Sequence, residues 1–488
     1  MFQYARTDAV AGVVVFLVAV PLCLGIAVAC GVPPVSGLVA GIVGGLVVPL
    51  ISRSPQSVTG PAAGLTSIVL MEVARLGGIA PFLTAVVIAG LLQVSFGLLR
   101  TGRYAALVPS AVIKGMLAAI GITIVWKQLP VAVGVSGSTG DILTGIEPSA
   151  GLIALLSLLL LYGWKHTPLS RFTLLSPALV VVVGASLLAR WFDSTALALD
   201  EAHFVAVPLG GLPALAGALP RPDWSVLARP DLWVAAVTIA VVASIETLLS
   251  LQAVDRLDPL KRHSPPDREL VAQGAANTLA GLFGGLPVTA VIVRSSANVA
   301  AGGRERFSTF IHGVLLLLAV LFAGPLLNAI PLACLAAILI QVGLNLCKPA
   351  LFSSQARLGF TQLLPFALTI AAVLALDLLK GVILGIVAGI SFVLYENSQR
   401  AVVADRDAAG VLRMRFRRDG TFVSKPSILS ALDSISDGDE VIIDGTDEYI
   451  DHDVKEVLAT FVDDARRRQI TVQIIGIDLA DAHGSGGH

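Results

Sequence analysis

Long apolar segments separated by short polar stretches occupy the chain up to about residue 397. About 20 apolar residues cross a bilayer, and on that measure the pattern predicts membrane-associated helices, two of them too short to cross alone. The fourteen predicted segments are 8–30, 34–52, 61–75 (short), 80–99, 106–128, 148–164, 174–191, 230–253, 269–285, 289–301 (short), 307–328, 329–347, 363–378 and 380–397.

The pattern changes after residue 397, where charged residues and short strand-like and helix-like runs replace the apolar segments. Alternating strands and helices are typical of a small α/β domain. We therefore expect a transmembrane domain at 1–397 and a cytoplasmic domain at 398–488. In the latter the pattern predicts strands at 411–417, 440–444 and 470–476 and helices at 425–434 and 452–468.

The apolar part repeats itself. Residues 106–124 align with residues 328–346 at an offset of 222 (331 − 109), which places Pro109 on Pro331 and Gly121 on Gly343. The same offset roughly superimposes the two short segments. Because seven segments per half is an odd number, the halves at about 8–191 and 230–397 must be inverted in the membrane. The expected fold is a polytopic α-helical membrane protein with fourteen segments in a 7+7 inverted repeat.

Composition supports a membrane protein and narrows its chemistry. The chain of 488 residues is 55% hydrophobic and 14% charged, whereas soluble domains carry about 25% charged residues. The four cysteines lie in apolar segments without metal or disulfide spacing, and we interpret them, like His312, as packing residues. No nucleotide loop or hydrolase motif is present, so we expect neither an enzyme nor an ATP-driven pump, and nothing points to nucleic acid.

The charges indicate the orientation. Most Arg and Lys residues outside the last domain lie at the segment ends that share a side with the N-terminus, and such loops are cytoplasmic under the positive-inside rule. We therefore expect both termini in the cytoplasm and the chain in a bacterial-type inner (plasma) membrane. The first segment has no cleavage site and is interpreted as a transmembrane helix.

Two proline breaks mark the short segments. In SVTGPAAGLTSIVL (57–70) we expect a helix to begin at Pro61. In GGLPVTAVIVRSSANV (284–299) we expect one to begin near Val288–Thr289. Inverted repeats would make these two N-termini converge, and converging N–H groups form an anion site. The alternative is a pair of kinked packing helices, but breaks at corresponding places in two halves favour a site.

Two charged residues lie inside apolar segments. Arg294 follows the second break and is either a counter-charge for an anion or a structural partner. Glu246, in VVASIETLLSLQ (241–252), could bind H⁺ or Na⁺ and couple it to a substrate, or form a fixed salt bridge with Arg294. Ser250, one helical turn on, could share a Na⁺ site. We expect no other metal or cofactor.

The pieces VRSSANVAAGGR (293–304), SVTGPAAGL (57–65) and SIETLLS (244–250) resemble the sulfate permease (SulP) family of anion transporters, kin of prestin and pendrin. Residues 441–476 resemble a STAS domain. The resemblance implies a core domain of segments 1–4 and 8–11, a gate domain of segments 5–7 and 12–14, and an elevator-like movement between them. It also implies a homodimer, and an anion held between the third and tenth segments.

Carried over residue by residue, the resemblance implies a cation-coupling role for Glu246. Val293 stands where many family members have serine, which leaves the anion open, and His452 stands where a phosphorylated serine would be needed. The substrate-binding residues that the resemblance implies are Leu22, Cys23, Pro61, Ala62, Ala63, Thr289, Ala290, Val291 and Arg294.

These observations predict a secondary transporter of a small anion, namely bicarbonate, sulfate or a dicarboxylate, driven by H⁺ or Na⁺ symport. An uncoupled anion exchanger or channel is the alternative. A nucleobase transporter would share the broken helices, but Arg294 and the STAS-like tail argue against it.

Overall fold

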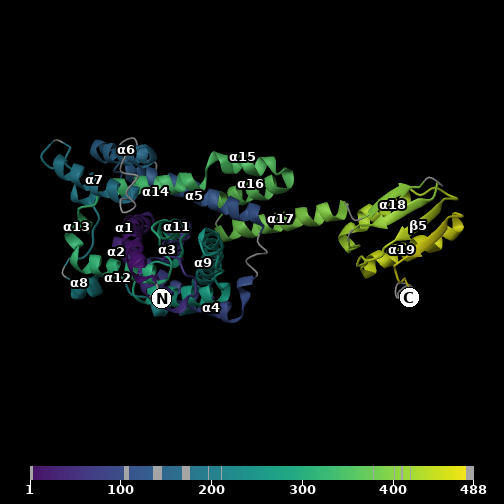
Figure 1. The fold of residues 1–488 in the computed structure, drawn as a ribbon, viewed down its shortest axis with the longest axis horizontal. Coiled ribbons are helices and arrows are strands. Elements are labelled where there is room, and N and C mark those ends of the chain that lie inside the picture. Colours follow the sequence, from purple (N-terminus) through teal and green to yellow (C-terminus); the bar gives the residue numbers. More distant parts are fainter. Residues whose placement is uncertain are drawn as a thin grey trace. The chain divides into compact units, whose positions relative to one another are not determined.

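The chain folds into two compact units in a computed structural model, Met1–Arg357 with Phe366–Leu384, and Leu358–Pro365 with Gly385–His488 (Figure 1). The boundary lies inside α17 (Leu378–Gln399), so this helix contributes to both units. The residues that the structure describes are 4–103, 109–135, 146–167, 176–195, 197–209, 211–376, 378–399, 402–407, 410–417 and 419–479.

Every predicted apolar segment corresponds to a helix, with ends that differ by a few residues. In the first half the elements are α1 (Ala5–Ala29), α2 (Pro34–Ile51), β1 (Thr59–Pro61), η1 (Ala63–Leu65), α3 (Thr66–Leu76), α4 (Ile79–Leu98), α5 (Ser110–Ala132), α6 (Pro148–Gly163), η4 (Trp164–His166) and α7 (Pro177–Phe192). The connection to the second half contains η6 (Glu201–His203), α8 (Gly211–Ala218) and η7 (Trp224–Ala228).

The second half repeats this order. Its elements are α9 (Pro230–Leu257), α10 (Pro266–Leu282), β2 (Val288–Ala290), α11 (Ile292–Ala300), α12 (Phe307–Phe322), α13 (Gly324–Asn328), α14 (Leu332–Leu346), α15 (Pro349–Arg357), α16 (Phe360–Ala375) and α17. Hydropathy did not predict α8 or α15, which are short. Among the described residues, six helices are long and apolar enough to cross a membrane by length and composition.

The internal repeat is visible at matching prolines and glycines. Pro109 and Pro331 each occupy the residue before a helix, α5 and α14, with extended backbone at ψ 136° and ψ 138°. The two helices pack against each other, and a Cβ on Gly121 would come within 2.5 Å of the Gly343 carbonyl oxygen. Equivalent positions of the two halves therefore meet where only glycine leaves room.

The helices of the first unit form two groups. In one group α10 packs on α4 and α2, α12 packs on α1 and α2, and α9 packs on α4; in the other, α14 packs on α5 and α6. Small residues at four-residue spacing in α2, Gly37, Gly41 and Gly45, allow close packing. A Cβ on Gly41 would meet the Cys23 sulfur at 2.8 Å, and one on Gly45 would meet Gly313 at 2.6 Å.

The second unit contains a four-stranded sheet in the order β3-β4-β5-β6 (Figure 1). The β3–β4 pair is antiparallel, and the β4–β5 and β5–β6 pairs are parallel. Alternate side chains of β4 are buried, and the amphipathic α19 adds Val454 and Leu458 to the same core. The elements are β3 (Val402–Arg406), β4 (Leu412–Phe416), η8 (Phe422–Ser424), α18 (Lys425–Asp433), β5 (Glu440–Asp444), α19 (His452–Arg467) and β6 (Thr471–Ile475).

The predicted strands and helices of this unit are confirmed within one or two residues. The side chain of Asp451 caps α19 by accepting a hydrogen bond from the Val454 N–H at 2.9 Å, as expected for an aspartate before an amphipathic run. Strand β3 was not predicted, because its apolar run Val402–Ala404 is only three residues long and is followed by Asp405 and Arg406.

Candidate functional site

The two proline breaks form a short antiparallel β ladder. Thr59 lies opposite Ala290, Gly60 opposite Thr289 and Pro61 opposite Val288. The prediction that helices begin at Pro61 and near Val288–Thr289 is therefore wrong. A proline disfavours helical backbone in the residue before it, and two extended segments inside a membrane can satisfy each other's polar backbone groups.

The half-helices begin only after the ladder. On one side the 3₁₀ turn η1 follows Ala62 and continues into α3, and on the other side α11 follows Val291. The first-turn N–H groups of α11, from Ile292 to Arg294, have no acceptor within their own helix. We call residues 58–65 and 288–294 together the junction.

The N–H groups of the predicted binding residues are only partly free. Pro61 has no N–H, and the Val291 N–H donates to the Val58 carbonyl at 2.9 Å. The Ala290 N–H points to the Thr247 hydroxyl oxygen at 3.4 Å. As far as the described residues show, the free amides at the second half-helix are therefore those of residues 292–294, a few residues later than predicted.

Arg294 is fully buried at the junction, with an exposed fraction of 0%. Its Nη2 donates to the Pro61 carbonyl oxygen at 3.3 Å. Among the described residues its Nε and Nη1 have no hydrogen-bond partner and its guanidinium forms no ion pair. An unpaired buried charge costs several kcal/mol, so this arrangement favours an anion as the missing partner.

Two buried side chains accompany the guanidinium. The Cys23 thiol lies beside the Arg294 guanidinium and interacts with it. His312 is close enough to Arg294 for an electrostatic interaction with its positive charge. Both ring nitrogens of His312 lack a hydrogen-bond partner within the described part of the chain. His312 is buried, as expected for a packing residue, but the described residues do not satisfy its ring nitrogens.

Glu246 contacts the first half-helix. The Gly64 N–H donates a hydrogen bond to its carboxylate, and a Cβ on Gly64 would come within 2.5 Å of Oε1. Within the described residues Glu246 and Arg294 form no ion pair, so the fixed salt bridge considered as an alternative is absent. Ser250 lies one turn on in α9, half-buried, and makes no hydrogen bond to Glu246 that the described residues reveal.

A buried polar network supports the junction from α10. Three residues at four-residue spacing, Glu269, Gln273 and Asn277, lie on one face of this helix and are at most 1% exposed. The Asn277 amide accepts from the Val288 N–H at 2.6 Å and donates to the Val288 carbonyl at 3.0 Å. The Gln273 Nε2 donates to the Thr59 hydroxyl at 2.7 Å. Sequence reasoning missed this network, although the four-residue spacing was a usable signal.

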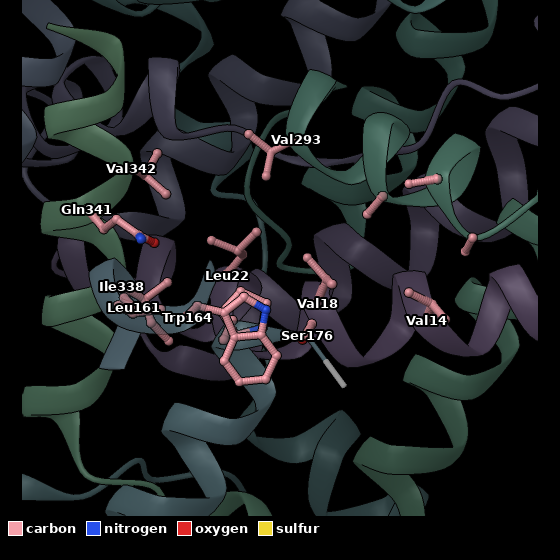
Figure 2. A pocket seen from close by; sticks show the side chains of 15 residues that line it. Val14, Val18, Leu22, Leu161, Trp164, Ser176, Val293, Ile338, Gln341 and Val342 are labelled. Atoms are coloured by element: carbon pink, nitrogen blue, oxygen red, sulfur yellow. The ribbon is translucent and has the colours of Figure 1, made fainter. Parts of the chain in front are cut away.

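A cavity of about 370 Å³ opens beside the junction (Figure 2). One wall comes from α1 and α11, and the facing wall from α6, η4, α7 and α14. Of the predicted site residues Leu22 lines this cavity, whereas Cys23 is buried behind it. Val293 also lines it and is 44% exposed, so the start of α11 faces open space.

The lining of this cavity is mostly apolar. Its polar side chains are Trp164, Ser176 and Gln341. Ser176 already accepts from the Leu179 N–H at 3.1 Å as the cap of α7. Figure 2 shows Gln341 extending from α14 toward Leu22. A charged solute in the cavity would therefore find its main electrostatic partners at the junction.

A protein-family model described as the sulfate permease family matches residues 6–369. The chain belongs to the sulfate permease family. The Bacillus subtilis (strain 168) protein YvdB is 26% identical over 97% of this chain and 92% of its own length. The bicarbonate transporter BicA of Picosynechococcus is 26% identical over 71% of this chain and 62% of its own length.

Solved structures agree with this membership of the sulfate permease family. The transmembrane domain of a cyanobacterial bicarbonate transporter BicA matches at a TM-score of 0.68 and 25% identity, over 80% of this chain and 98% of that one. The murine anion transporter Slc26a9, in the inward-facing state, matches at 0.78 and 16% identity, over 100% and 88%. The second likeness establishes the fold, an SLC26-type transmembrane domain. The relatives and solved structures are named as transporters, among them transporters of bicarbonate, which supports a role in anion transport for this chain.

Proposed function

We propose that this protein is a secondary active transporter that carries a small anion, bicarbonate, sulfate or a dicarboxylate, by H⁺ or Na⁺ symport. The observation that carries the proposal is Arg294. Its guanidinium is buried between two half-helices without an anionic partner among the described residues. A helix N-terminus favours negative charge, and a buried arginine adds a full positive charge.

The substrate would sit at the mouth of the junction. The first-turn amides of α11 and the turn at Ala62 and Ala63 would approach it from two sides, and Leu22 and Val293 would shape the apolar wall. The ladder would set the distance between the half-helices, and this would be the role of Pro61, Thr289, Ala290 and Val291. Cys23 would contribute through its contact with Arg294.

Glu246 is the proposed coupling residue. Its carboxylate accepts the Gly64 N–H at the start of the first half-helix, so a proton or Na⁺ bound there would change the charge next to the substrate. Ser250 would supply an oxygen to a Na⁺ ion at this place. Binding of the cation and of the anion would then favour each other by charge compensation.

Transport would move one helix group against the other. We assign α1–α4 and α9–α12 to a core group that holds the junction, and α5–α7 and α14–α17 to a gate group. An elevator-like movement would carry the junction past the gate, and the cavity between α1, α11 and the facing α7 and α14 would be its open side. We further propose cytoplasmic termini, a plasma-membrane location, a homodimer and a STAS identity for residues 398–488.

The test is uptake into proteoliposomes that contain the full chain. Sulfate, bicarbonate and succinate are each offered with no gradient, with an inward H⁺ gradient and with an inward Na⁺ gradient, and uracil serves as the uncharged solute. We expect one anion to accumulate above equilibrium only with one of the gradients. Equilibration that ignores both gradients would favour an exchanger or channel, and uptake of uracil alone would exclude anion transport.

A further inference from the structure

Glu269 is a buried carboxyl group for which the proposed mechanism has no use. It lies in the first turn of α10, is 1% exposed, and forms no ion pair within the described chain. Its Oε1 accepts from the Gln273 Nε2 at 2.9 Å, and its Oε2 accepts from the Ser52 hydroxyl. A structural carboxylate in a core is normally paired with a cation, and among the residues described here this one is held by neutral groups only.

Charged side chains lie near Glu269, but none of those described forms an ion pair with it. The Arg306 guanidinium donates to the Ser52 carbonyl oxygen, and Arg268 donates to the Ile51 carbonyl at 2.7 Å. Asp255 on α9 acts on Glu269 as a like charge. The remaining neighbours, α2, α4 and β2, carry no charged residue. The neighbours in sequence of Ser52 and Glu269, Arg53 and Arg268, are exposed.

The neutral partners can serve both protonation states. With Glu269 ionised, the Gln273 Nε2 donates to both the carboxylate and the Thr59 hydroxyl oxygen, and the Gln273 Oε1 is a buried acceptor without a partner in the part of the chain that the structure describes. With Glu269 protonated, a half-turn of the amide would let Oε1 accept from the carboxyl O–H and from the Thr59 hydroxyl. An amide offers donors and an acceptor on one rigid plane, so this exchange needs no backbone movement.

We propose that Glu269 is a reversible proton-binding site whose state reaches the junction through Gln273 and Thr59. Thr59 pairs with Ala290 across the ladder, and the next residue, Gly60, contacts Arg294. If Gln273 offers Thr59 an acceptor in place of a donor, the change therefore occurs at the residue next to Gly60, which contacts the Arg294 guanidinium. The inference rests on the proposed function only in taking the junction as the anion site; proton binding itself does not depend on it.

The test is infrared difference spectroscopy of the purified full chain between acidic and neutral pH. It is performed in a Glu246→Gln background, so that Glu246 does not contribute. A buried protonated carboxyl group has its own carbonyl stretching band. We expect a titrating band in Glu246→Gln that is lost in Glu246→Gln/Glu269→Gln. A band of equal amplitude in both, or no titrating band in either, would overturn the inference.

A second pair of variants covers the case in which Glu269→Gln does not fold. Gln273→Leu removes one of the two hydrogen-bond donors to the carboxyl group, and Gln93→Leu makes the same change at a buried glutamine that instead accepts from Asn277 at 2.6 Å. We expect Gln273→Leu to shift the midpoint of the band and Gln93→Leu to leave it in place. Equal midpoints in the two variants would overturn the connection through Gln273. Failure of symport in proteoliposomes, by contrast, would leave this band unaffected.

Discussion

Gly60 of β1 lies directly against Arg294 of α11, so close that a Cβ on Gly60 would overlap Nη1 of the guanidinium. The residue opposite Gly60 in the ladder is Thr289. The Arg294 guanidinium of the second half can therefore occupy this place only because residue 60 of the first half is a glycine. The first prediction tests this contact.

Gly60→Ala should displace the guanidinium and lower anion uptake by about tenfold or more, which corresponds to about 1.4 kcal/mol of lost stabilisation. Uptake of sulfate and bicarbonate into proteoliposomes measures the effect. Gly151→Ala is the matched control, because a Cβ at Gly151 meets no atom within 4 Å. Uptake that falls equally in both variants would contradict the role of this contact.

Arg294→Ala should reduce anion uptake more than Arg294→Lys does, since lysine keeps the charge but not the fork of donors. A hydrogen bond to a charged group contributes about 1.5–3 kcal/mol, so we expect a loss of about tenfold to a hundredfold for the alanine variant. Arg190→Ala, at an exposed arginine of α7, is the control. If Arg294→Ala transports as the wild type does, the guanidinium is not the counter-charge.

Glu246→Gln should abolish the dependence of uptake on the H⁺ or Na⁺ gradient while the protein stays folded. Glutamine retains an acceptor for the Gly64 N–H but can neither take up a proton nor balance Na⁺. Uptake with and without each gradient measures this, with Glu201→Gln in the exposed η6 as the control. Preserved gradient dependence in Glu246→Gln would remove this residue from the coupling mechanism.

Asn277→Leu should destabilise the first unit, because the N–H and the carbonyl of Val288 would lose their partner in a buried place. Each orphaned group costs about 1–3 kcal/mol. We expect the apparent Tm of the purified chain to fall by about 5 °C or more. Asn345→Leu makes the same change at an exposed position of α14, and an equal fall there would show that the network carries no special stability.

Asp439→Asn should change the acid sensitivity of the second unit. Hydrogen bonds from Arg406, at 2.6 and 3.1 Å, hold the pKa of Asp439 below its usual 3.8. A lowered pKa in the folded state gives stability that is complete above pH 3.8 and is lost as the pH falls through the folded-state pKa. Calorimetry of the full chain should therefore show a lower Tm for Asp439→Asn at neutral pH and convergence with wild type in strong acid. A difference that is independent of pH would contradict the ion-pair explanation.

The sequence predicted the helices well because hydropathy dominates in a membrane, and the matching prolines at 109 and 331 revealed the repeat before any contact was known. It predicted Arg294 and Glu246 because isolated charges in apolar segments are costly. It missed the β ladder, since three-residue strands have no periodicity to detect. It also missed the contacts of Gln273 and Asn277 with the ladder, because their four-residue spacing marks one face of a helix but does not reveal that the partners are Thr59 and Val288.

The ladder between Thr59–Pro61 and Val288–Ala290 has a consequence for how such a site could diversify. Its two strands pair through their backbones, and the Asn277 amide holds the backbone of Val288 from behind, so the width of the gap between the two half-helices does not depend on the side chains that face the gap. Side chains around the gap, such as Val293 and Leu22, can then be exchanged without altering its width. The main chain would then limit the size of the ion that fits the gap, and the side chains around the gap would select among ions of that size.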